Sequence, residues 1–440
     1  MREARMSARA RDSVRGAFLG YAVDYFDIYL PVVALAPAMA YFQPRNLPDS
    51  IETTLFYLVF ATTLLGRPIG AIVFGQFADR IGRKRVTNIS VGGFAIVTLA
   101  TALLPGYRTW GLAALLVLIA MRLLDGFFLG GEYTSNNTLA IEVMPKRLRG
   151  VLGGLLASAF PTAYVAISLV TAVLLHFLPA SGVDSPYVQW GWRIPFVVGA
   201  GLAVAFLLYY RRVPESQAWM EAAKSESPLR ELLRGAHLRD VAQIFVMMTG
   251  FWFTTQAVSG VLPGLLITTL KLPSALVTNG ILVATVVLFG GYVGAGALSQ
   301  AIGRRLTITL FGLSTLVLGC GLYWALVTNA LRGGPIAVTI ALAGVVLVLT
   351  VSPWGIATTY INERFPTRVR SSGYGVGYSL AVVIPSFYSF YLLGLSHLMP
   401  YPYTQIVLLA ISGVLIVVGS RLGPETRDVD MVPAAAEARA

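Results

Sequence analysis

The chain has 440 residues, of which 56% are hydrophobic and 12% charged, with a formal net charge of +12. So few polar residues cannot cover a water-soluble globule of this size, and apolar runs longer than about 18 residues recur along the chain. The composition excludes a soluble globular protein and predicts a membrane protein with many spans.

In chain order, twelve apolar runs are long enough to cross a bilayer as helices. The first run is too long for the apolar segment of a cleavable signal peptide, and it contains two aspartates. The predicted spans are residues 16–41, 53–78, 86–104, 109–136, 150–178, 190–210, 240–268, 274–299, 306–328, 335–360, 371–397 and 401–420.

Two motifs of the first half return 221 residues later in the second half. The turn from Gly75 to Lys84 matches the stretch from Gly296 to Arg305, and the same shift carries Glu142, Pro145, Arg147 and Arg149 onto Glu363, Pro366, Arg368 and Arg370. The shift also carries the first six spans onto the last six. The repeat therefore predicts two six-helix bundles with the functional site at their interface.

The polar segments outside the spans complete the predicted division of the chain. The segment between the halves is the longest of them, and Ser227 followed by Pro228 predicts a short helix on the membrane surface there. The predicted parts are an N-terminal tail (1–15), a first bundle (16–210), a linker (211–239), a second bundle (240–421) and a C-terminal tail (422–440).

Most lysines and arginines lie in the two tails and in the turns after even-numbered spans. The opposite loops contain only Arg45, Arg108, Lys271 and Arg332. By the positive-inside rule, both termini are predicted in the cytoplasm and the protein in the inner membrane. The net charge therefore reflects topology, and we expect no nucleic-acid partner.

The stretch from Gly75 through Asp79 and Gly82 to Lys84 resembles the signature loop of the major facilitator superfamily. Other stretches resemble the metabolite:proton symporter family within it; these are Asp24-Tyr-Phe-Asp27, Gly66-Arg67-Pro68-Ile-Gly70, Arg122-Leu-Leu-Asp125-Gly126, Gly130-Gly131-Glu132, Trp190-Gly-Trp192-Arg193, Glu215-Ser216 and Glu363-Arg-Phe-Pro366. The resemblance runs from about Gly16 to Arg421. It implies an all-α, twelve-helix fold and symport of protons with organic acids, zwitterionic osmolytes or related metabolites.

The chain departs from that family pattern at several positions. The family usually has Glu where Asp24 stands and Gln where Asp125 stands. No long helix is predicted after the twelfth span, which argues against osmosensing through such a helix. Drug-exporting relatives carry a Gly-Pro pair where this chain has Phe160-Pro161, which argues against drug export.

Carboxylates and arginines in the repeated turns can pair between neighbouring helix ends and hold them together in one conformation. Basic turns also arise from topology alone, but Asp79 and Glu142 lie within a repeated pattern, which favours a gate. The predicted cytoplasmic gate consists of Asp79, Arg83, Glu142, Arg149, Glu363 and Arg370.

Charged residues also lie inside the spans of the first half, where each costs roughly 2.5–3.5 kcal/mol to insert. The acids are Asp24, Asp27, Asp125 and Glu132, and the deep bases are Arg67 and Arg122. Buried ion pairs that only hold helices together are the alternative to a functional role. Because four acids face two arginines, we expect at least one acid to carry a proton at neutral pH.

Asp27 is the first choice for proton coupling, because the family resemblance includes it and it can exchange a proton for Arg122. Asp24, Asp125 and Glu132 are the other candidates. In the second half, the 221-residue shift brings no charged counterparts, and aromatic and amide side chains occupy the spans instead. The predicted substrate-binding residues are Arg67, Arg122, Trp252, Gln256, Trp354 and Tyr378.

The sequence shows no motif of a metal site, a hydrolase or a nucleotide-driven pump. His176, His237 and His397 have no ligand spacing with one another. We therefore expect no cofactor, no metal and no enzymatic activity, with the proton gradient as the energy source.

The sequence predicts a monomeric transporter that imports a small carboxylate with protons by rocking of its two halves. A neutral or zwitterionic substrate, such as a sugar, polyol or betaine, is the alternative if the acids already neutralise Arg67 and Arg122. A proton-driven exporter and a metabolite sensor are also open, because the sequence does not give the direction of transport.

Overall fold

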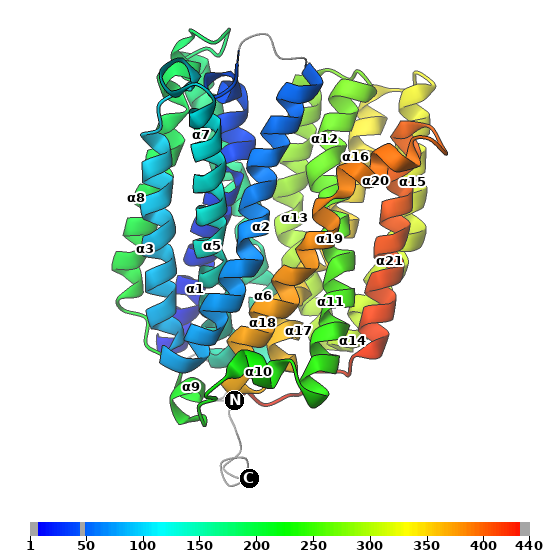
Figure 1. Ribbon diagram of the computed structural model, residues 1–440. Helices are drawn as coiled ribbons and strands as arrows, with labels where there is room; N and C mark the ends of the chain where they lie inside the picture. Colours follow the sequence, from blue (N-terminus) through cyan, green and yellow to red (C-terminus); the bar gives the residue numbers. More distant parts are fainter. Residues whose placement is uncertain (1–7, 45–48, 432–440) are drawn as a thin grey trace.

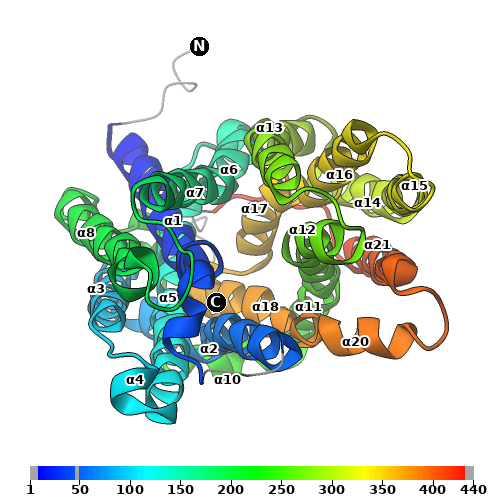
Figure 2. The ribbon, with the colours of Figure 1, turned by 90° about the horizontal axis from the view of Figure 1, so that it is seen from above.

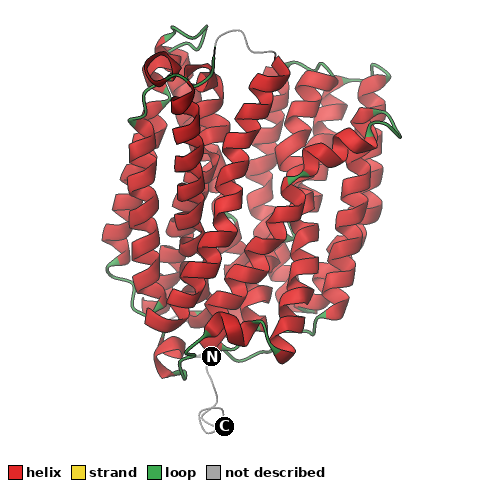
Figure 3. Cartoon of the chain, in the orientation of Figure 1, coloured by secondary structure: helices red, strands yellow, loops and turns green. Residues whose placement is uncertain are grey.

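The computed structural model describes residues 8–44 and 49–431 as a bundle of roughly parallel helices, and those residues contain no strand (Figure 3). Within these described ranges, twelve helical segments are long and apolar enough to cross a membrane, as predicted. In the view from above, the helices of the first half and those of the second form two groups side by side (Figure 2). The predicted all-α fold with twelve spans is confirmed.

The helices of the first half are α1 (Ala8–Tyr29), α2 (Asp49–Ile81), α3 (Arg83–Ala102), α4 (Tyr107–Trp110), α5 (Leu112–Val143), α6 (Arg149–Ala157), α7 (Ala159–Phe177) and α8 (Arg193–Tyr210). Two short helices follow, α9 (Gln217–Glu221) and α10 (Pro228–Leu232). The second half contains α11 (Gly235–Thr255), α12 (Leu262–Gly264), α13 (Ser274–Ile302), α14 (Arg304–Ser314), α15 (Cys320–Leu331), α16 (Ile336–Val351), α17 (Trp354–Arg364), α18 (Arg370–Ser379), α19 (Val383–Ser386), α20 (Tyr388–Leu395) and α21 (Thr404–Leu422).

The basic turns between α2 and α3, α5 and α6, α13 and α14, and α17 and α18 all lie at one end of the bundle, which we call the basic end. The helices α9 and α10 lie at the same end, at the bottom of Figure 1. Helix α1 begins at Ala8, earlier than the predicted start at residue 16, so the predicted tail 1–15 is partly helical. Residues 1–7 lie outside the described part of the chain.

The linker helix α10, predicted to lie on the membrane surface, packs against other parts of the protein. Leu232 is fully buried in the main apolar cluster, and Leu229 packs against the same cluster. Glu231 pairs with Arg368 at 2.5 Å. The helix therefore packs against protein at the basic end, because its leucines find a protein surface there.

Several spans change helix type along their length. The seventh span continues from α11 into a π-helical segment, Gln256–Val261, before α12. The first span likewise passes from α1 into a π-helical segment, Leu30–Leu35, which contains Pro31. Such insertions often occur at functional sites because they turn side chains off the regular helical face.

Glycines let α2 and α5 pack in direct backbone contact. A β-carbon on Gly70 would lie 1.8 Å from the carbonyl oxygen of Phe127, and one on Gly126 would lie 2.0 Å from that of Thr63. The halves approach equally closely at Gly296, where a β-carbon would lie 2.2 Å from the carbonyl oxygen of Gly150. Small residues serve this role in membrane helices because they remove the side chain that would hold backbones apart.

We predict that Gly70→Val prevents correct packing of α2 on α5, because the new side chain meets backbone and not a movable side chain. The variant should be lost from the monodisperse fraction when a fluorescent fusion is extracted in detergent and passed over a size-exclusion column. Gly92→Val is the control, because no atom lies within 4 Å of a β-carbon at Gly92. Equal monodisperse yields of the two variants would contradict the assigned close packing.

Candidate transport site and gate

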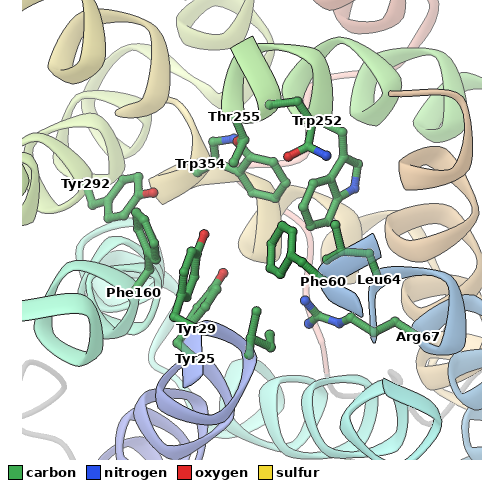
Figure 4. A pocket seen from close by; sticks show the side chains of 12 residues that line it. Tyr25, Tyr29, Phe60, Leu64, Arg67, Phe160, Trp252, Thr255, Tyr292 and Trp354 are labelled. Carbon is green, nitrogen blue, oxygen red and sulfur yellow. The ribbon is translucent and has the colours of Figure 1, made fainter. Parts of the chain in front are cut away.

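A small cavity lies between the two halves and is lined mainly by aromatic side chains (Figure 4). Its volume of about 40 Å³ is smaller than a metabolite, so the lining must move before a metabolite can bind there. The lining residues are Tyr25, Ile28, Tyr29, Phe60, Leu64, Arg67, Phe160, Trp252, Thr255, Gln256, Tyr292 and Trp354.

Arg67 is the charged residue of that lining, and its guanidinium contacts an acid and an aromatic ring. It pairs with Asp24 at 3.5 Å and lies 4.5 Å from the centre of the Tyr133 ring. Arg67 is 3% exposed and Asp24 is fully buried. The second carboxylate oxygen of Asp24 has no hydrogen-bond partner among the described residues. The pair is thus buried, and its acid is incompletely satisfied.

Arg122 lies in a separate cluster of α1, α3 and α5 and does not line the cavity. Its guanidinium is 3.7 Å from Asp27 and 3.3 Å from Asp125, and it donates to Thr101 at 3.0 Å. Thr98 donates to Asp27 and lies 3.4 Å from Asp125. Two buried carboxylates therefore share one guanidinium, which leaves this cluster with an excess negative charge unless one acid binds a proton.

Glu132 is a fully buried acid of α5 that interacts electrostatically with Asp24 and Arg67. Asn136 donates to one of its carboxylate oxygens at 2.7 Å, and the other oxygen has no partner among the described residues. Gly20 of α1 allows this contact, because a β-carbon there would lie 2.6 Å from the carboxylate. The first half thus contains a third buried acid site with no cation in hydrogen-bond contact among the residues described.

The predicted substrate residues fall into two groups. Arg67, Trp252, Gln256 and Trp354 line the cavity. Arg122 and Tyr378 do not.

Tyr378 supports the cavity from one side. Its ring lies 5.5 Å from Trp252 and 5.7 Å from Trp354, and its carbonyl accepts the indole N–H of Trp252 at 2.9 Å. Its hydroxyl reaches Tyr21 of the first half at 3.1 Å.

Sequence reasoning missed the aromatic side chains that the first half contributes to the cavity. Tyr25 and Tyr29 come from α1, Phe60 from α2 and Phe160 from α7. The signal for the α1 pair was available, because tyrosines at 21, 25 and 29 recur every four residues and therefore share one helical face. The contact between Phe160 and Tyr292 joins the halves at the cavity, with ring centres 6.5 Å apart.

The predicted gate residues meet at the basic end and pair across the halves. Arg370 donates to Glu142 at 2.8 Å, and Arg149 donates to Glu363 at 3.1 Å. Arg83 joins the first pair by donating to Glu142 at 3.2 Å. Each acid therefore binds an arginine of the other half, so separation of the halves breaks both contacts.

Asp79 of the first half contacts the N-terminus of α18 in the second half. It accepts from the backbone N–H groups of Ser371 at 3.1 Å and Ser372 at 2.8 Å, in the first turn of α18. A carboxylate is favoured there because helix N-termini present free N–H groups and a positive dipole end. Gln300, its counterpart in the repeat, likewise accepts from the backbone N–H of Gly150 at 2.9 Å.

At the gate, the stretch Glu215-Ser216 has a second copy, Glu425-Thr426, which was not predicted from the sequence. Glu215 accepts from the backbone N–H of Lys84 at 3.0 Å, and Glu425 accepts from that of Arg304 at 2.8 Å. Pro-Glu-Ser at 214–216 and Pro-Glu-Thr at 424–426 carry the signal. These motifs are 210 residues apart, so the single 221-residue shift does not align them.

Residues 422–431 of the predicted C-terminal tail, 422–440, contact both halves of the protein. The carbonyl of Val429 accepts from Arg149 at 3.0 Å, Asp430 pairs with Lys146 at 3.0 Å, and Met431 is 4% exposed. The remaining tail residues, 432–440, lie outside the described part of the chain. This segment therefore adds to the contacts that hold the basic end closed.

The chain matches known transporters along most of its length. The model of the family described as Major Facilitator Superfamily matches residues 17–389. The chain belongs to this superfamily. This facilitator is therefore a transporter embedded in a membrane and not an enzyme.

Two relatives from Escherichia coli strain K12 are each 32% identical to this facilitator. The inner membrane metabolite transport protein YhjE aligns over 84% of this chain and 83% of its own. The alpha-ketoglutarate permease aligns over 84% of each chain. A putative proline/betaine transporter of Staphylococcus haemolyticus is 33% identical over 58% of this chain and 54% of its own.

Solved structures of the proton:xylose symporter XylE share the fold of this facilitator. The complex with 6-bromo-6-deoxy-D-glucose has a TM-score of 0.75 at 19% identity and covers 97% of this chain and 99% of its own. The partially occluded inward open form from E. coli has a TM-score of 0.68 at 20% identity and covers 96% of this chain and 99% of its own. At this identity the likeness shows the fold alone.

We predict that Arg149→Gln with Arg370→Gln loosens the basic end, because each change removes an ion pair between the halves. In a Cys320→Ser background, Thr134→Cys places a thiol at the buried interface beside α18. An impermeant maleimide added from the basic end should label it about tenfold faster, the factor that ~1.4 kcal/mol in the conformational equilibrium produces.

The matched control for this labelling experiment is Arg364→Gln, because Arg364 pairs with Asp240 within one half. It should leave the labelling rate unchanged. An equal rate in the gate variant and the control would show that the crossed ion pairs do not hold the halves together.

Proposed function

We propose that this transporter is a proton-coupled symporter that imports a small organic carboxylate. The observation that carries the proposal is the position of Arg67, which lines the cavity and whose guanidinium is paired with Asp24 at 3.5 Å. A proton on Asp24 would release the charge of Arg67 for a substrate carboxylate, so that proton binding and anion binding support each other. The relative named alpha-ketoglutarate permease is consistent with a carboxylate.

Asp27 and Arg122 form the proposed proton-coupling centre beside this anion site. Their cluster contains two acids and one base, so one proton neutralises it without any substrate. Loss of that proton would draw Arg122 more strongly towards Asp27 and change the packing of α1 against α5. Asp24, Asp125 and Glu132 remain the other candidate proton sites.

The proposed transport cycle is a rocking of the two bundles, residues 16–210 and 240–421, around the cavity. We place the basic end in the cytoplasm of a cell with this transporter in its inner membrane, because the lysines and arginines concentrate there. The conformation described is then closed towards the cytoplasm by the crossed gate pairs. Protons and substrate would enter from the opposite side and leave after those pairs separate.

A zwitterionic substrate with a quaternary ammonium group is the second candidate. Its carboxylate would meet Arg67, and its cation would lie among the rings of Trp252, Trp354 and Tyr29, which favour cations by cation–π attraction. The relative named a putative proline/betaine transporter is consistent with this substrate class.

A neutral sugar or polyol would hydrogen-bond in the cavity without needing the charge of Arg67. Proton-driven export would use the same residues in the opposite direction. We propose a monomer with no nucleic-acid partner and no cofactor.

We predict that Asp27→Asn abolishes uphill accumulation of substrate in proteoliposomes with an imposed proton gradient, because the amide cannot take up a proton. Exchange of labelled for unlabelled substrate should continue. Asp184→Asn, at an exposed ion pair with Arg108, is the control and should accumulate substrate normally. Unchanged accumulation by Asp27→Asn would assign coupling to Asp24, Asp125 or Glu132.

We predict that Arg67→Gln lowers carboxylate affinity by at least about thirtyfold, since loss of a buried charge partner costs roughly 2–5 kcal/mol. Binding of a labelled carboxylate to purified protein measures the effect. Arg67→Lys should restore only part of the affinity, because lysine keeps the charge but not the two-pronged geometry. Normal carboxylate affinity in Arg67→Gln would refute an anion site at this residue.

A further inference from the structure

A second cavity lies at the basic end, on the outside of the first half, where α1 passes α6 and α8. In the view from above, α1 runs from the outer edge of this half towards the middle of the molecule, with α8 on one side and α6 and α7 on the other (Figure 2). The cavity has a volume of about 510 Å³, and its floor includes Phe18, Leu19 and Leu155. We call it the rim groove.

The rim groove carries two arginines whose guanidinium groups have no protein partner among the described residues. Arg15 of α1 and Arg212, directly after α8, both line it with exposed side chains. The structure gives neither guanidinium an ion pair or a hydrogen bond to any residue of the ranges 8–44 and 49–431. By contrast, the arginines at the gate are buried and paired.

The two arginines are brought together by a contact between α1 and α8. Tyr209 donates its hydroxyl hydrogen to the backbone carbonyl of Asp12 at 3.3 Å, which fixes the first turns of α1 against the end of α8. The Asp12 side chain is the one carboxylate on the groove lining within the described ranges. Two arginines and one aspartate leave a net charge of +1, which one phosphodiester would neutralise.

We propose that the rim groove binds an anionic phospholipid of the leaflet at the basic end. The phosphate would lie against Arg15 and Arg212, and an acyl chain would run along Phe18 and Leu19 towards Leu155. Basic groups above an apolar groove between spanning helices suit a phospholipid, because its head and tail need those two surfaces at that depth. A soluble anion would leave the apolar floor uncovered.

A lipid bound in the rim groove would affect the transport site, because α1 belongs to both. The helix is continuous from Ala8 to Tyr29, so the groove residues and both Asp24 and Asp27 lie on one rigid element. Asp24 lies about 14 Å along the helix from Arg15 at 1.5 Å per residue. A lipid that contacts α1 at Arg15 and Phe18 would therefore help to fix the positions of Asp24 and Asp27.

The test uses the full-length transporter in detergent with equal amounts of phosphatidylglycerol and phosphatidylcholine, and native mass spectrometry counts the bound lipids. We expect wild type to retain phosphatidylglycerol preferentially. The variant Arg15→Gln with Arg212→Gln should lose the preference, by about fivefold for each arginine. The matched control is Arg230→Gln with Arg421→Gln, two exposed arginines at the basic end outside the groove, which should keep it.

Three results would overturn the proposal. They are undiminished retention in the groove variant, an equal loss in the control, and displacement of the lipid by millimolar inorganic phosphate, which would indicate a free-anion site.

A second measurement places the acyl chain and does not depend on mutating the arginines. Leu19→Trp, at a side chain that is 42% exposed, puts a fluorophore in the rim groove. Phosphatidylglycerol with brominated chains should quench it more than brominated phosphatidylcholine does. Leu306→Trp, at a position 47% exposed on α14, should show no such difference. Equal quenching by the two lipids at Leu19→Trp would contradict the proposal.

Discussion

The need to hold charge inside the membrane governs the first half of this molecule. Four carboxylates and two guanidiniums are almost completely buried there, and each unpaired charge at that depth would cost several kcal/mol. Asp24 with Arg67, and Asp27 and Asp125 with Arg122, reduce that cost by pairing. Because α2 and α5 touch backbone to backbone at their glycines, their arginines are held at fixed depth against the acids of α1 and α5.

The first half has four buried carboxylates and only two buried guanidiniums, so pairing leaves carboxylates that can bind protons. In our proposal, these carboxylates couple protons to transport. Arg67 faces the cavity while Arg122 does not, so the two arginines have different surroundings and, in our proposal, different tasks. Both depend on α1, which carries Asp24 and Asp27. A change of protonation on either acid therefore acts on the same helix that lines the cavity with Tyr25 and Tyr29.

The gate follows a different physical rule, because it must be stable in one conformation and separable in another. Each of its acids accepts hydrogen bonds from the opposite half, and Asp79 binds the free N–H groups at the start of α18. Such contacts are strong when desolvated, yet they can be replaced by water when the halves part. The docked segment around Val429 joins the same set of contacts, so this part of the chain lies where closure occurs.

Much of the fold could be predicted from the sequence, because span length, basic turns and the 221-residue repeat all follow from the bilayer and from duplication. The arrangement of the site could not. A repeat identifies Glu142 and Glu363 as equivalent, but it does not say that each pairs with the other half. Counting residues along the predicted spans places Arg67 and Arg122 at the same depth. In the structure the backbone of Arg67 lies opposite Gly130, eight residues beyond Arg122 in α5, so the two arginines lie at different depths and only Arg67 lines the cavity. The packing of α2 against α5 sets this offset, and a single sequence does not reveal it.

Movement of a carboxylate coupled to movement of protons is the central claim. The direct measurement uses proteoliposomes with an internal pH dye, to which a dicarboxylate that does not cross the bilayer unaided is added outside, with protein-free liposomes as the control. We expect acidification of the interior that starts with the carboxylate and depends on the transporter. Uptake of labelled dicarboxylate by the transporter with no change of internal pH would contradict the claim.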